Sequence, residues 1–490
     1  MGAVLVEQLL NSDHGGHGGQ HLACGRGHQA EFIDYRTKHL QTILGDVQVR
    51  RAYYHCAECR EEGGRGVIPK DQELDIVGTS FSPGMRRLMA RVGAQEPFDA
   101  ARQDLAELAG VVVPTKAVER ISEAVGAAAE AAIGAERAVI LAGQGLPVAE
   151  AARLYVALDG TGVPAVPRET EGRASKAADG KAQTREAKLG CVFTQTGFDE
   201  EGWPIRDPES TTYVGAIETA EEFGARLYTE AVRRGLKRAT TVIVLGDGAP
   251  WIWNLAEAHF SGAVHIVDLY HAREHLAAVG RLAFGSGSEP GKVWVAARRD
   301  ELDAGEVEVV IAAIRNLPSN DPKVQNELRK EAEYFETNKL RMCYKHFRAR
   351  GFFVGSGVVE AGCKTVIGQR LKQSGMRWTV AGANAVIALR CRLLGNRWED
   401  LWRSAACLWS DVGVSAPTNL SHTRCPSPSP CPCLCPMQWF PVDPGGGRHE
   451  PFHSGTGTAR AQARVELDQS HFLRRQVRID ASVDGTRGEV

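Results

Sequence analysis

The sequence predicts an α/β fold with a mixed, at least partly parallel sheet and an all-helical insertion. Between residues 151 and 275, apolar strand-like runs alternate with helical segments, which is typical of such a sheet. Residues 276–345 have a helical pattern only, broken at GSGSEPG and LPSNDP. The predicted parts are a flexible tail at 1–20, a Cys/His module at 21–66, a helical segment at 67–150, a sheet domain at 151–275 and 346–410, the insertion at 276–345 and an extension at 411–490.

The composition is that of a globular protein. Of the 490 residues, 43% are hydrophobic and 24% are charged, which argues against wholesale disorder and against a membrane protein. No apolar run approaches the ~18 residues of a membrane span, and the chain does not begin like a secretory signal peptide. We therefore expect a cytoplasmic protein.

The first 66 residues predict a metal-binding hairpin after a glycine-rich tail. The stretch HGGHGGQH predicts a flexible tail within residues 1–20. Two segments rich in β-branched and aromatic residues follow, separated by a break at Leu44-Gly45-Asp46, which is a hairpin signal.

Four metal donors flank this hairpin. His21-x2-Cys24 and Cys56-x2-Cys59 have the spacing of a zinc ribbon and predict one structural Zn²⁺. His28 competes with His21 for the fourth position. The alternative is a β-rich segment whose three thiols bind no metal.

Helices are predicted from residue 82 onward. Apolar spacing marks one helix after Ser82, a second that stops at Gly110 and a third that starts at Pro114. Two helices joined by a turn of three or four residues suit a helix-turn-helix, whose second helix would contact DNA. The alternative is a helical hairpin that binds nothing.

The sheet domain is predicted from four strand-like runs and the segments between them. The runs are LYVALDGTGVPAV, KLGCVFTQTG, TTVIVLGDG and AVHIV, and a mobile loop is expected from Arg168 to Lys188. Helices are expected over FGARLYTEAVRRG and, opened by Pro250, over PWIWNLAEAHF.

Three acids occupy positions suited to metal chemistry. Asp159 and Asp247 each follow an apolar run and precede a glycine, so their carboxylates emerge at strand ends. Glu360 comes from a helix predicted between Ser356 and Gly375. Oxygen donors from separate elements suit a pair of Mg²⁺ ions, although each aspartate alone is as consistent with a turn.

The predicted helix of Glu360 should also bring a cation and an apolar face to the sheet. If the helix is regular, one face carries, after Glu360, the residues Lys364, Ile367 and Leu371.

The order Asp, Asp, Glu, with a helical insertion before the glutamate, resembles that of the RNase H-like DDE transposases. The motifs YVALDGTGVP, VIVLGDGAPWIWNLAE, HIVDLYHAREHL, SGVVEAGCK and RLKQSGMRW are similar to those of the ISKra-type transposases of bacterial insertion sequences. The resemblance runs from about His21 to Trp402. It implies an RNase H-like catalytic domain preceded by a zinc-ribbon-like module and a helix-turn-helix-like segment.

The resemblance also implies a function and its residues. Asp159, Asp247 and Glu360 would be the catalytic triad of a DNA transposase, holding two Mg²⁺ or Mn²⁺ ions for strand cleavage and strand transfer. Asp268-x2-His271 is similar to a signature that follows the second acid, and we expect these two residues in the second shell of the metals. The alternative for this pair is a helix cap with a buried histidine.

The implied partners are the terminal repeats of the element and its target DNA. We expect a homo-oligomer, at least a dimer, on DNA, and association with the nucleoid. The alternatives are an inactive or domesticated copy that only binds DNA, and an RNase H-like nuclease without strand transfer. The extension after Trp402 has no counterpart in the family pattern.

A basic region surrounds the third acid. Between residues 341 and 403 there are 12 Lys and Arg residues against three acids, whereas the whole chain has a net charge of -2. We expect Trp378 to stack on an unpaired base or, alternatively, to belong to the core. The predicted phosphate contacts are Lys364, Arg370, Lys372 and Arg377.

The last 80 residues differ in composition. Nine of the 22 prolines lie between residues 417 and 451, so residues 411–490 are expected to be a disordered extension. Its Cys-Pro-Cys-Leu-Cys spacing is too tight for a tetrahedral metal site.

Overall fold

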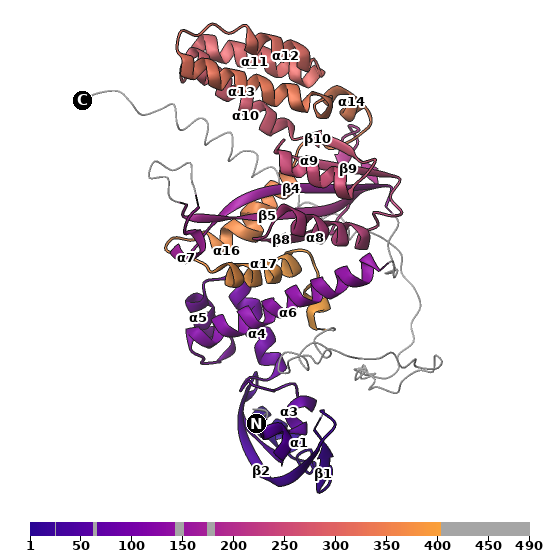
Figure 1. Ribbon diagram of the computed structural model, residues 1–490, viewed down its shortest axis with the longest axis vertical. Coiled ribbons are helices and arrows are strands. Elements are labelled where there is room, and N and C mark those ends of the chain that lie inside the picture. The colour runs from indigo at the N-terminus through magenta and orange to yellow at the C-terminus, as the bar shows by residue number, and fades with distance from the viewer. Residues whose placement is uncertain (25, 62–65, 143–150, 174–181, 403–490) are drawn as a thin grey trace, which may run out of the picture. The chain divides into compact units, whose positions relative to one another are not determined.

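A computed structural model describes residues 1–24, 26–61, 66–142, 151–173 and 182–402 (Figure 1). The chain divides into two compact units after Ala416, and all described residues belong to the first. The predicted extension at 411–490 lies outside the described residues. Among these residues, no helix combines the length and the apolar character that crossing a membrane requires.

A mixed five-stranded sheet forms the centre of the fold. Its order is β10-β9-β4-β5-β8, with β4, β9 and β10 parallel and β5 and β8 antiparallel to their neighbours. The predicted α/β class with a mixed sheet is therefore confirmed. The strands are β4 (Arg153–Pro164), β5 (Thr184–Gln195), β8 (Thr212–Ala216), β9 (Thr241–Gly246) and β10 (Val264–Val267).

Helices cover both faces of this sheet. A Cβ atom on Gly190 of β5 would touch Leu227 on one face, whereas the neighbouring Leu189 lies against Gly362 on the other. Successive strand residues point to opposite faces, so the two helix layers are separated by the sheet. The first face carries α8 (Ala220–Arg233) and α9 (Pro250–His259), and the second carries α15 (Gly357–Gly362), the π-helical η2 (Cys363–Gly368), α16 (Gln369–Leu371) and α17 (Val380–Leu394).

A further helical layer packs on α17. The buried residues Val118, Ile121 and Val125 recur along one side of α6, as expected for a helix with an apolar face. At Gly126, a Cβ atom would stand 2.3 Å from the backbone oxygen of Ala385 in α17, so the close approach requires glycine. The three helices of this layer are α4 (Pro83–Gln95), α5 (Phe98–Ala109) and α6 (Thr115–Leu141).

The N-terminal module is built on a long hairpin. Strands β2 and β3 pair from Glu31↔His55 to Thr42↔Gly45, which confirms the predicted hairpin. Gly45 has φ +118°, a conformation that favours glycine at the turn. The elements are α1 (Gly2–Leu10), β1 (His21–Ala23), β2 (Gln29–Thr42), β3 (Gly45–His55), α2 (Ala57–Glu61) and α3 (Pro69–Glu73).

The first 20 residues are not a flexible tail, and that prediction is wrong. They contain α1, whose Ala3, Val6 and Leu10 pack on a small apolar core with β3. The glycine-rich stretch is also ordered, since the amide of Gly18 donates to the Tyr54 hydroxyl at 2.8 Å. The spacing of three and four residues between the apolar side chains of α1 was the overlooked helical signal.

The insertion is all helical, as predicted. Figure 1 shows its helices side by side beyond β10. They are α10 (Leu269–Phe284), α11 (Glu289–Ala304), α12 (Val307–Arg315), α13 (Pro322–Asn338), the 3-10 turn η1 (Lys339–Arg341) and α14 (Tyr344–Ala349).

Two parts of the sheet domain differ from the prediction. The expected loop from Arg168 to Lys188 is shorter, because α7 (Pro167–Thr170) lies at its start and β5 begins at Thr184. Residues 174–181 lie outside the described part of the chain. Strand β8 and the short β6 (Gly197–Phe198) and β7 (Pro204–Ile205) were not predicted.

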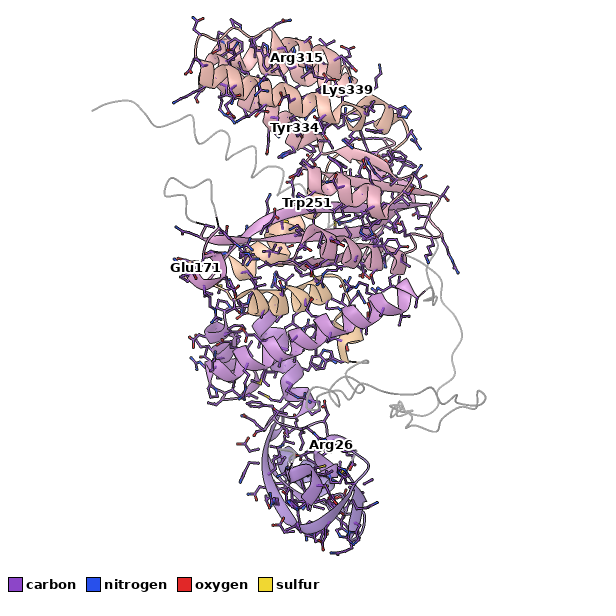
Figure 2. The ribbon with its side chains drawn as sticks, viewed as in Figure 1. Arg26, Glu171, Trp251, Arg315, Tyr334 and Lys339 are labelled. Atoms are coloured by element: carbon purple, nitrogen blue, oxygen red, sulfur yellow. The ribbon has the colours of Figure 1, made fainter. Side chains whose placement is uncertain are left out.

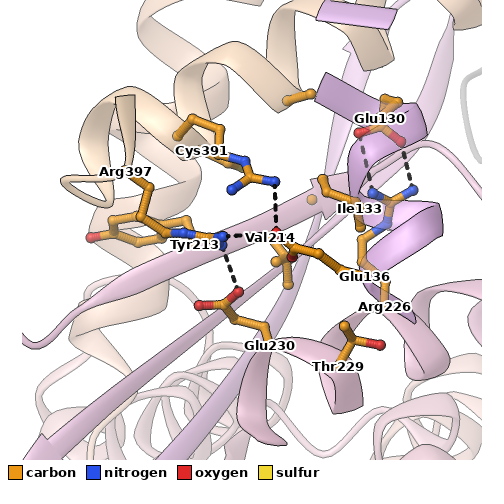
Figure 3. Close-up of a pocket in the computed structure, with 13 residues that line it drawn as sticks. Glu130, Ile133, Glu136, Tyr213, Val214, Arg226, Thr229, Glu230, Cys391 and Arg397 are labelled. Carbon is orange, nitrogen blue, oxygen red and sulfur yellow. Dashed lines mark hydrogen bonds and ion pairs between the residues drawn. The ribbon is translucent and has the colours of Figure 1, made fainter. Parts of the chain in front are cut away.

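Buried ion pairs connect α6, α8 and the segment that follows α17 (Figure 3). Arg226 pairs with Glu130 at 2.9 Å, and Arg397 pairs with Glu230 at 2.8 Å, beside a cavity of about 10 Å³. Burial alone would raise the pKa of Glu230, but Arg397 holds that pKa below its ordinary value. Because each acid of these two pairs is neutralised by an arginine, the cluster serves the fold.

Candidate functional site

Two of the predicted acids belong to adjacent parallel strands, Asp159 within β4 and Asp247 directly after the end of β9. Ala157 of β4 pairs with Leu245 of β9, and the same register carried two residues further aligns Asp159 with Asp247. The two carboxylates are near enough that Asp247 contributes to raising the pKa of Asp159. The sheet therefore brings together two acids that are separated by 88 positions in the sequence.

The backbone holds both aspartates. The amide of Gly160 donates to Asp159 Oδ1 at 2.7 Å, and the amide of Ala249 donates to Asp247 Oδ1 at 2.9 Å. The buried Cys363 thiol also donates to Asp159. These bonds orient the carboxylates before any ligand arrives.

Glu360 reaches the same region from α15. Asp159 pairs with Leu189, which lies on the face covered by α15, so Asp159 points toward this helix. The Ser356 hydroxyl donates to Glu360 Oε1 at 3.5 Å and makes no side-chain capping bond to α15. Asp159 also contributes to raising the pKa of Glu360.

Asp268 links the helix of Glu360 to the sheet. This carboxylate is fully buried, caps α10 by accepting the His271 amide at 2.7 Å, and also accepts the Ser356 amide. His271 lies close enough to lower the pKa of Asp159. Asp268 and His271 thus lie beside the three acids. Asp268 caps α10, as in the alternative given for this pair, but His271 is only partly buried.

The electrostatics of the acids favour a bound cation. Burial is the main cause that raises the pKa of both Asp159 and Glu360, and neighbouring carboxylates add to it. Unpaired negative charges in a partly buried site are stabilised by a divalent ion, and carboxylate oxygens are the ligands that Mg²⁺ prefers. Among the described residues, the three acids are not one of the close donor groups that could hold a metal ion.

We expect replacement of Asp159 by Asn to stabilise the metal-free protein. Folding raises the pKa of Asp159, so the ionised carboxylate destabilises the folded state at pH 7. This loss of stability develops as the pH rises from the pKa of Asp159 in the unfolded chain to its higher pKa in the folded protein. The Asn variant lacks that cost, so its thermal midpoint in EDTA at pH 7 should be about 1–3 °C higher. Below the unfolded pKa the two midpoints should converge. A lower midpoint for Asp159→Asn at pH 7 would contradict this account.

Three of the predicted DNA-binding cations are exposed, and two of these lie near the acids. Lys364 lowers the pKa of Glu360, which opposes the effect of burial. Lys372 donates from its Nζ to the hydroxyl of Thr161, two residues beyond Asp159 on β4. Arg377 is also exposed. Lys364 and Lys372 thus place positive charge beside two of the acids.

Arg370 and Trp378 have structural roles, which corrects the predicted DNA contacts. Arg370 is fully buried, donates to the backbone oxygen of Gly93 at 3.0 Å and stacks on Phe98 and Trp378. The Trp378 indole is also buried and donates to the Leu371 carbonyl at 3.0 Å. Burial lowers the pKa of Arg370 to about 10. The charge of Arg370 could be predicted from the sequence, but the burial of its side chain could not.

The helix that carries Glu360 does not continue as a regular α-helix. Directly after α15 the chain forms the π-helical η2, so a regular α-helical spacing from Glu360 does not hold. Ile367 and Leu371 are nevertheless buried, as predicted, and the exposed Lys364 is close enough to Glu360 to lower its pKa.

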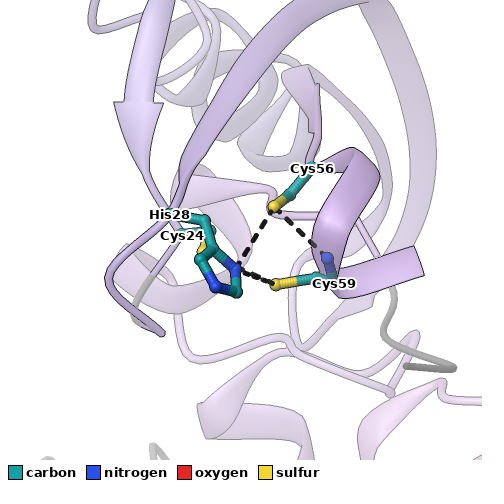
Figure 4. Close-up of side chains that lie close together, drawn as sticks. All are labelled: Cys24, His28, Cys56 and Cys59. Atoms are coloured by element: carbon teal, nitrogen blue, oxygen red, sulfur yellow. Dashed lines mark hydrogen bonds between the residues drawn. The ribbon is translucent and has the colours of Figure 1, made fainter. Parts of the chain in front are cut away.

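A second group of residues forms a metal-binding arrangement in the N-terminal module (Figure 4). The donor atoms of Cys24, His28, Cys56 and Cys59 all lie within 4.8 Å of one another. Cys24 and Cys59 Sγ atoms are 3.5 Å apart, and His28 Nδ1 is 3.5 Å from Cys59 Sγ and 3.9 Å from Cys56 Sγ. Thiolates bound tetrahedrally to Zn²⁺ at 2.3 Å would be about 3.8 Å apart, so this group could bind zinc.

The fourth donor is His28, and His21 is not part of the group. His21 lies exposed on β1, paired with Glu31. The Cys24 amide donates to the His28 carbonyl at 3.0 Å, which closes the β1–β2 loop and brings the two side chains together. His28, the alternative fourth ligand in the sequence analysis, therefore replaces His21. The closure of the loop, and not the two-residue spacing, decides which histidine lies next to the cysteines.

The thiols of this group differ in their affinity for protons. A hydrogen bond from the Arg26 backbone lowers the pKa of Cys24 to about 7, whereas burial and the neighbouring thiols raise the pKa of Cys59 to about 12. Zinc binds thiolates, so its binding would release protons and weaken as pH falls.

Several residues at the acid site were missed in the sequence. Cys363, Ser356 and Tyr334 contact the acids or the backbone next to them. Cys363 and Ser356 lie within four residues of Glu360, which was the available signal. Tyr334 is 87 residues from Asp247, and no sequence pattern marks it.

The sequence matches no known family, and its structure has a weak likeness to a solved structure. No protein-family model matches the sequence, and no curated protein matches it. Among solved structures, the chain is similar to the Drosophila P element transposase strand transfer complex, with a TM-score of 0.21 and 8% identity over 69% of this chain and 84% of that chain. A likeness at this TM-score supports no argument about fold or function.

Proposed function

We propose that this protein is an ISKra-type DNA transposase of a bacterial insertion sequence, with an RNase H-like catalytic domain. The observation that supports the proposal most is the register of β4 and β9, which aligns Asp159 with Asp247 on the side reached by Glu360. Together these three acids would hold two Mg²⁺ or Mn²⁺ ions. When bound, the ions would activate the attacking oxygen and stabilise the leaving 3′ oxygen in strand cleavage and strand transfer.

The residues around the acids would orient the reaction. Gly160 and Cys363 hold Asp159, Ala249 holds Asp247, and Ser356 holds Glu360, so each carboxylate is restrained before DNA binds. Lys364 and Lys372 would bind the phosphates on either side of the scissile bond.

DNA binding would be shared with the N-terminal parts of the chain. Helix α6 is buried against α4 and α17, yet Lys116 and Arg120 in its first turns are exposed and could contact DNA. We propose that these helices and the zinc-ribbon-like module recognise the element ends. Joining two ends to one target would require at least a dimer on DNA, associated with the nucleoid.

Neutralising two exposed cations should weaken binding to every DNA sequence. In a Lys372→Gln/Arg377→Gln variant, two lost phosphate contacts should lower the slope of log affinity against log salt by about 2. Arg370→Gln is the contrasting variant, because this buried side chain should affect stability and not the slope. Affinities measured at several salt concentrations decide the matter, and an unchanged slope in the double variant would place the DNA elsewhere.

The proposal is tested with DNA from the ends of the element. Inverted repeats bounded by short direct repeats should flank the gene, and labelled duplexes of these repeats should be nicked and joined to target DNA by the purified protein with Mg²⁺ or Mn²⁺. Binding without cleavage would favour the inactive or domesticated copy. Cleavage without joining would favour an RNase H-like nuclease.

A further inference from the structure

A network of polar and aromatic contacts runs from the helical insertion to the acid site. Tyr334, labelled in Figure 2, projects from α13, and its hydroxyl donates to the backbone carbonyl of Asp247 at 2.9 Å. This bond joins the insertion to the loop that presents one of the three acids.

The loop after β9 is shaped around the Tyr334 ring. Gly248 has φ +99°, and a Cβ atom at this position would stand 2.6 Å from Tyr334 Cε2. Only glycine fits both the backbone conformation and the ring. The position of Asp247 and the position of Tyr334 therefore depend on each other.

His275, which is itself in contact with His271, packs on the Tyr334 ring. The His275 ring stacks on Tyr334 with centroids 3.8 Å apart and planes at 17°. Glu331 Oε2 lies 2.6 Å from His275 Nδ1, and His275 Nε2 lies 3.3 Å from His271 Nε2. Glu331 and Tyr334 both belong to α13, so this helix orients the histidines and the tyrosine together.

The same network continues to the other acids through α10. His271 donates its amide to Asp268, which also accepts the amide of Ser356, and the Ser356 hydroxyl reaches Glu360. The Asp268 amide donates to the Gly246 carbonyl at 2.8 Å, next to Asp247. Helices α10 and α13 thus contact the surroundings of both Asp247 and Glu360.

From these contacts we infer that helix α13 of the insertion positions the acid site, and that Tyr334 is the positioning residue that holds Asp247 in place for metal binding. The metal-binding part of this inference rests on the proposed function. The helical insertion then has a role beyond adding surface for DNA, because the geometry of the acid site depends on Tyr334.

Tyr334→Phe is the direct test, because the variant keeps the ring that stacks on His275 and removes only the hydroxyl. Tyr344→Phe is the matched control, since the hydroxyl of this buried tyrosine on α14 has no hydrogen-bond partner among the described residues. The full-length, metal-free proteins are titrated with Mn²⁺, and free Mn²⁺ is followed by its electron paramagnetic resonance signal. The difference between wild type and Asp159→Asn defines the ions bound at the acid site.

Tyr334→Phe should weaken Mn²⁺ binding at the acid site about fivefold, the effect of one lost hydrogen bond, while Tyr344→Phe binds as wild type does. Hydrogen exchange at the Ala249 amide, which donates to Asp247, should also be faster in Tyr334→Phe than in Tyr344→Phe. Wild-type Mn²⁺ affinity in Tyr334→Phe would overturn the inference. If wild type and Asp159→Asn bind Mn²⁺ alike, the proposed function fails, and exchange at Ala249 alone then decides whether α13 holds the loop.

Discussion

Glu360→Gln should abolish both nicking and strand joining while leaving DNA affinity within about twofold of wild type. The substitution keeps the size of the side chain and its bond to the Ser356 hydroxyl, but it removes the charge that would bind a metal. Asp159→Asn and Asp247→Asn should behave alike, because all three acids would serve the same ions. Cleavage and joining of element-end DNA with Mg²⁺ and Mn²⁺, measured beside DNA binding, provide the test.

Two further variants show whether such a loss is specific. Glu327→Gln, an exposed acid on α13, should retain full activity. Asp268→Asn should slow the reaction without eliminating it, since an amide oxygen can still accept the backbone amides of His271 and Ser356. Substantial strand transfer in any of the three triad variants would refute the assignment of these acids.

Loss of a single zinc ligand should release the metal and unfold the N-terminal module. Structural Zn²⁺ contributes an apparent binding free energy of about 10–16 kcal/mol in small modules, much more than the few buried apolar residues around Cys56 and Cys59 can replace. The wild-type chain is expected to contain one zinc, and His28→Ala and Cys59→Ser to contain none. Metal analysis by mass spectrometry and the thermal unfolding profile measure the two effects.

His21→Ala is the informative control for this prediction, because His21 lies outside the donor group. It should keep its zinc, as should Cys343→Ser, which removes a distant thiol. The pH dependence has a defined sign: with thiol pKa values of about 7 for Cys24 and about 12 for Cys59, a chelator should strip the metal more readily as pH falls. Zinc lost from His21→Ala and kept by His28→Ala would reverse the assignment.

Local patterns were sufficient for most elements of the fold. The alternation of strand and helix, the long hairpin and the helical insertion each follow from the periodicity of apolar residues, since periods of 2 and 3.6 bury one face in each element. The prediction for residues 1–20 was wrong, because the glycine-rich stretch was taken as evidence of a flexible tail and the short amphipathic helix before it was overlooked. It also missed β8, a five-residue strand whose place is set by pairing with β5.

The sequence by itself also identified which residue types could carry chemistry: three acids in suitable settings, and three cysteines with two candidate histidines. Only the tertiary structure decided how they meet. The choice of His28 over His21 depends on closure of the β1–β2 loop, and the alignment of Asp159 with Asp247 depends on strand register. The burial of Arg370 depends on packing against Phe98 and Trp378, and the contact of Tyr334 with Asp247 joins residues 87 positions apart. Periodicity reports which face of an element is buried, but the partner across that face is set by the packing of distant segments, which no local pattern encodes.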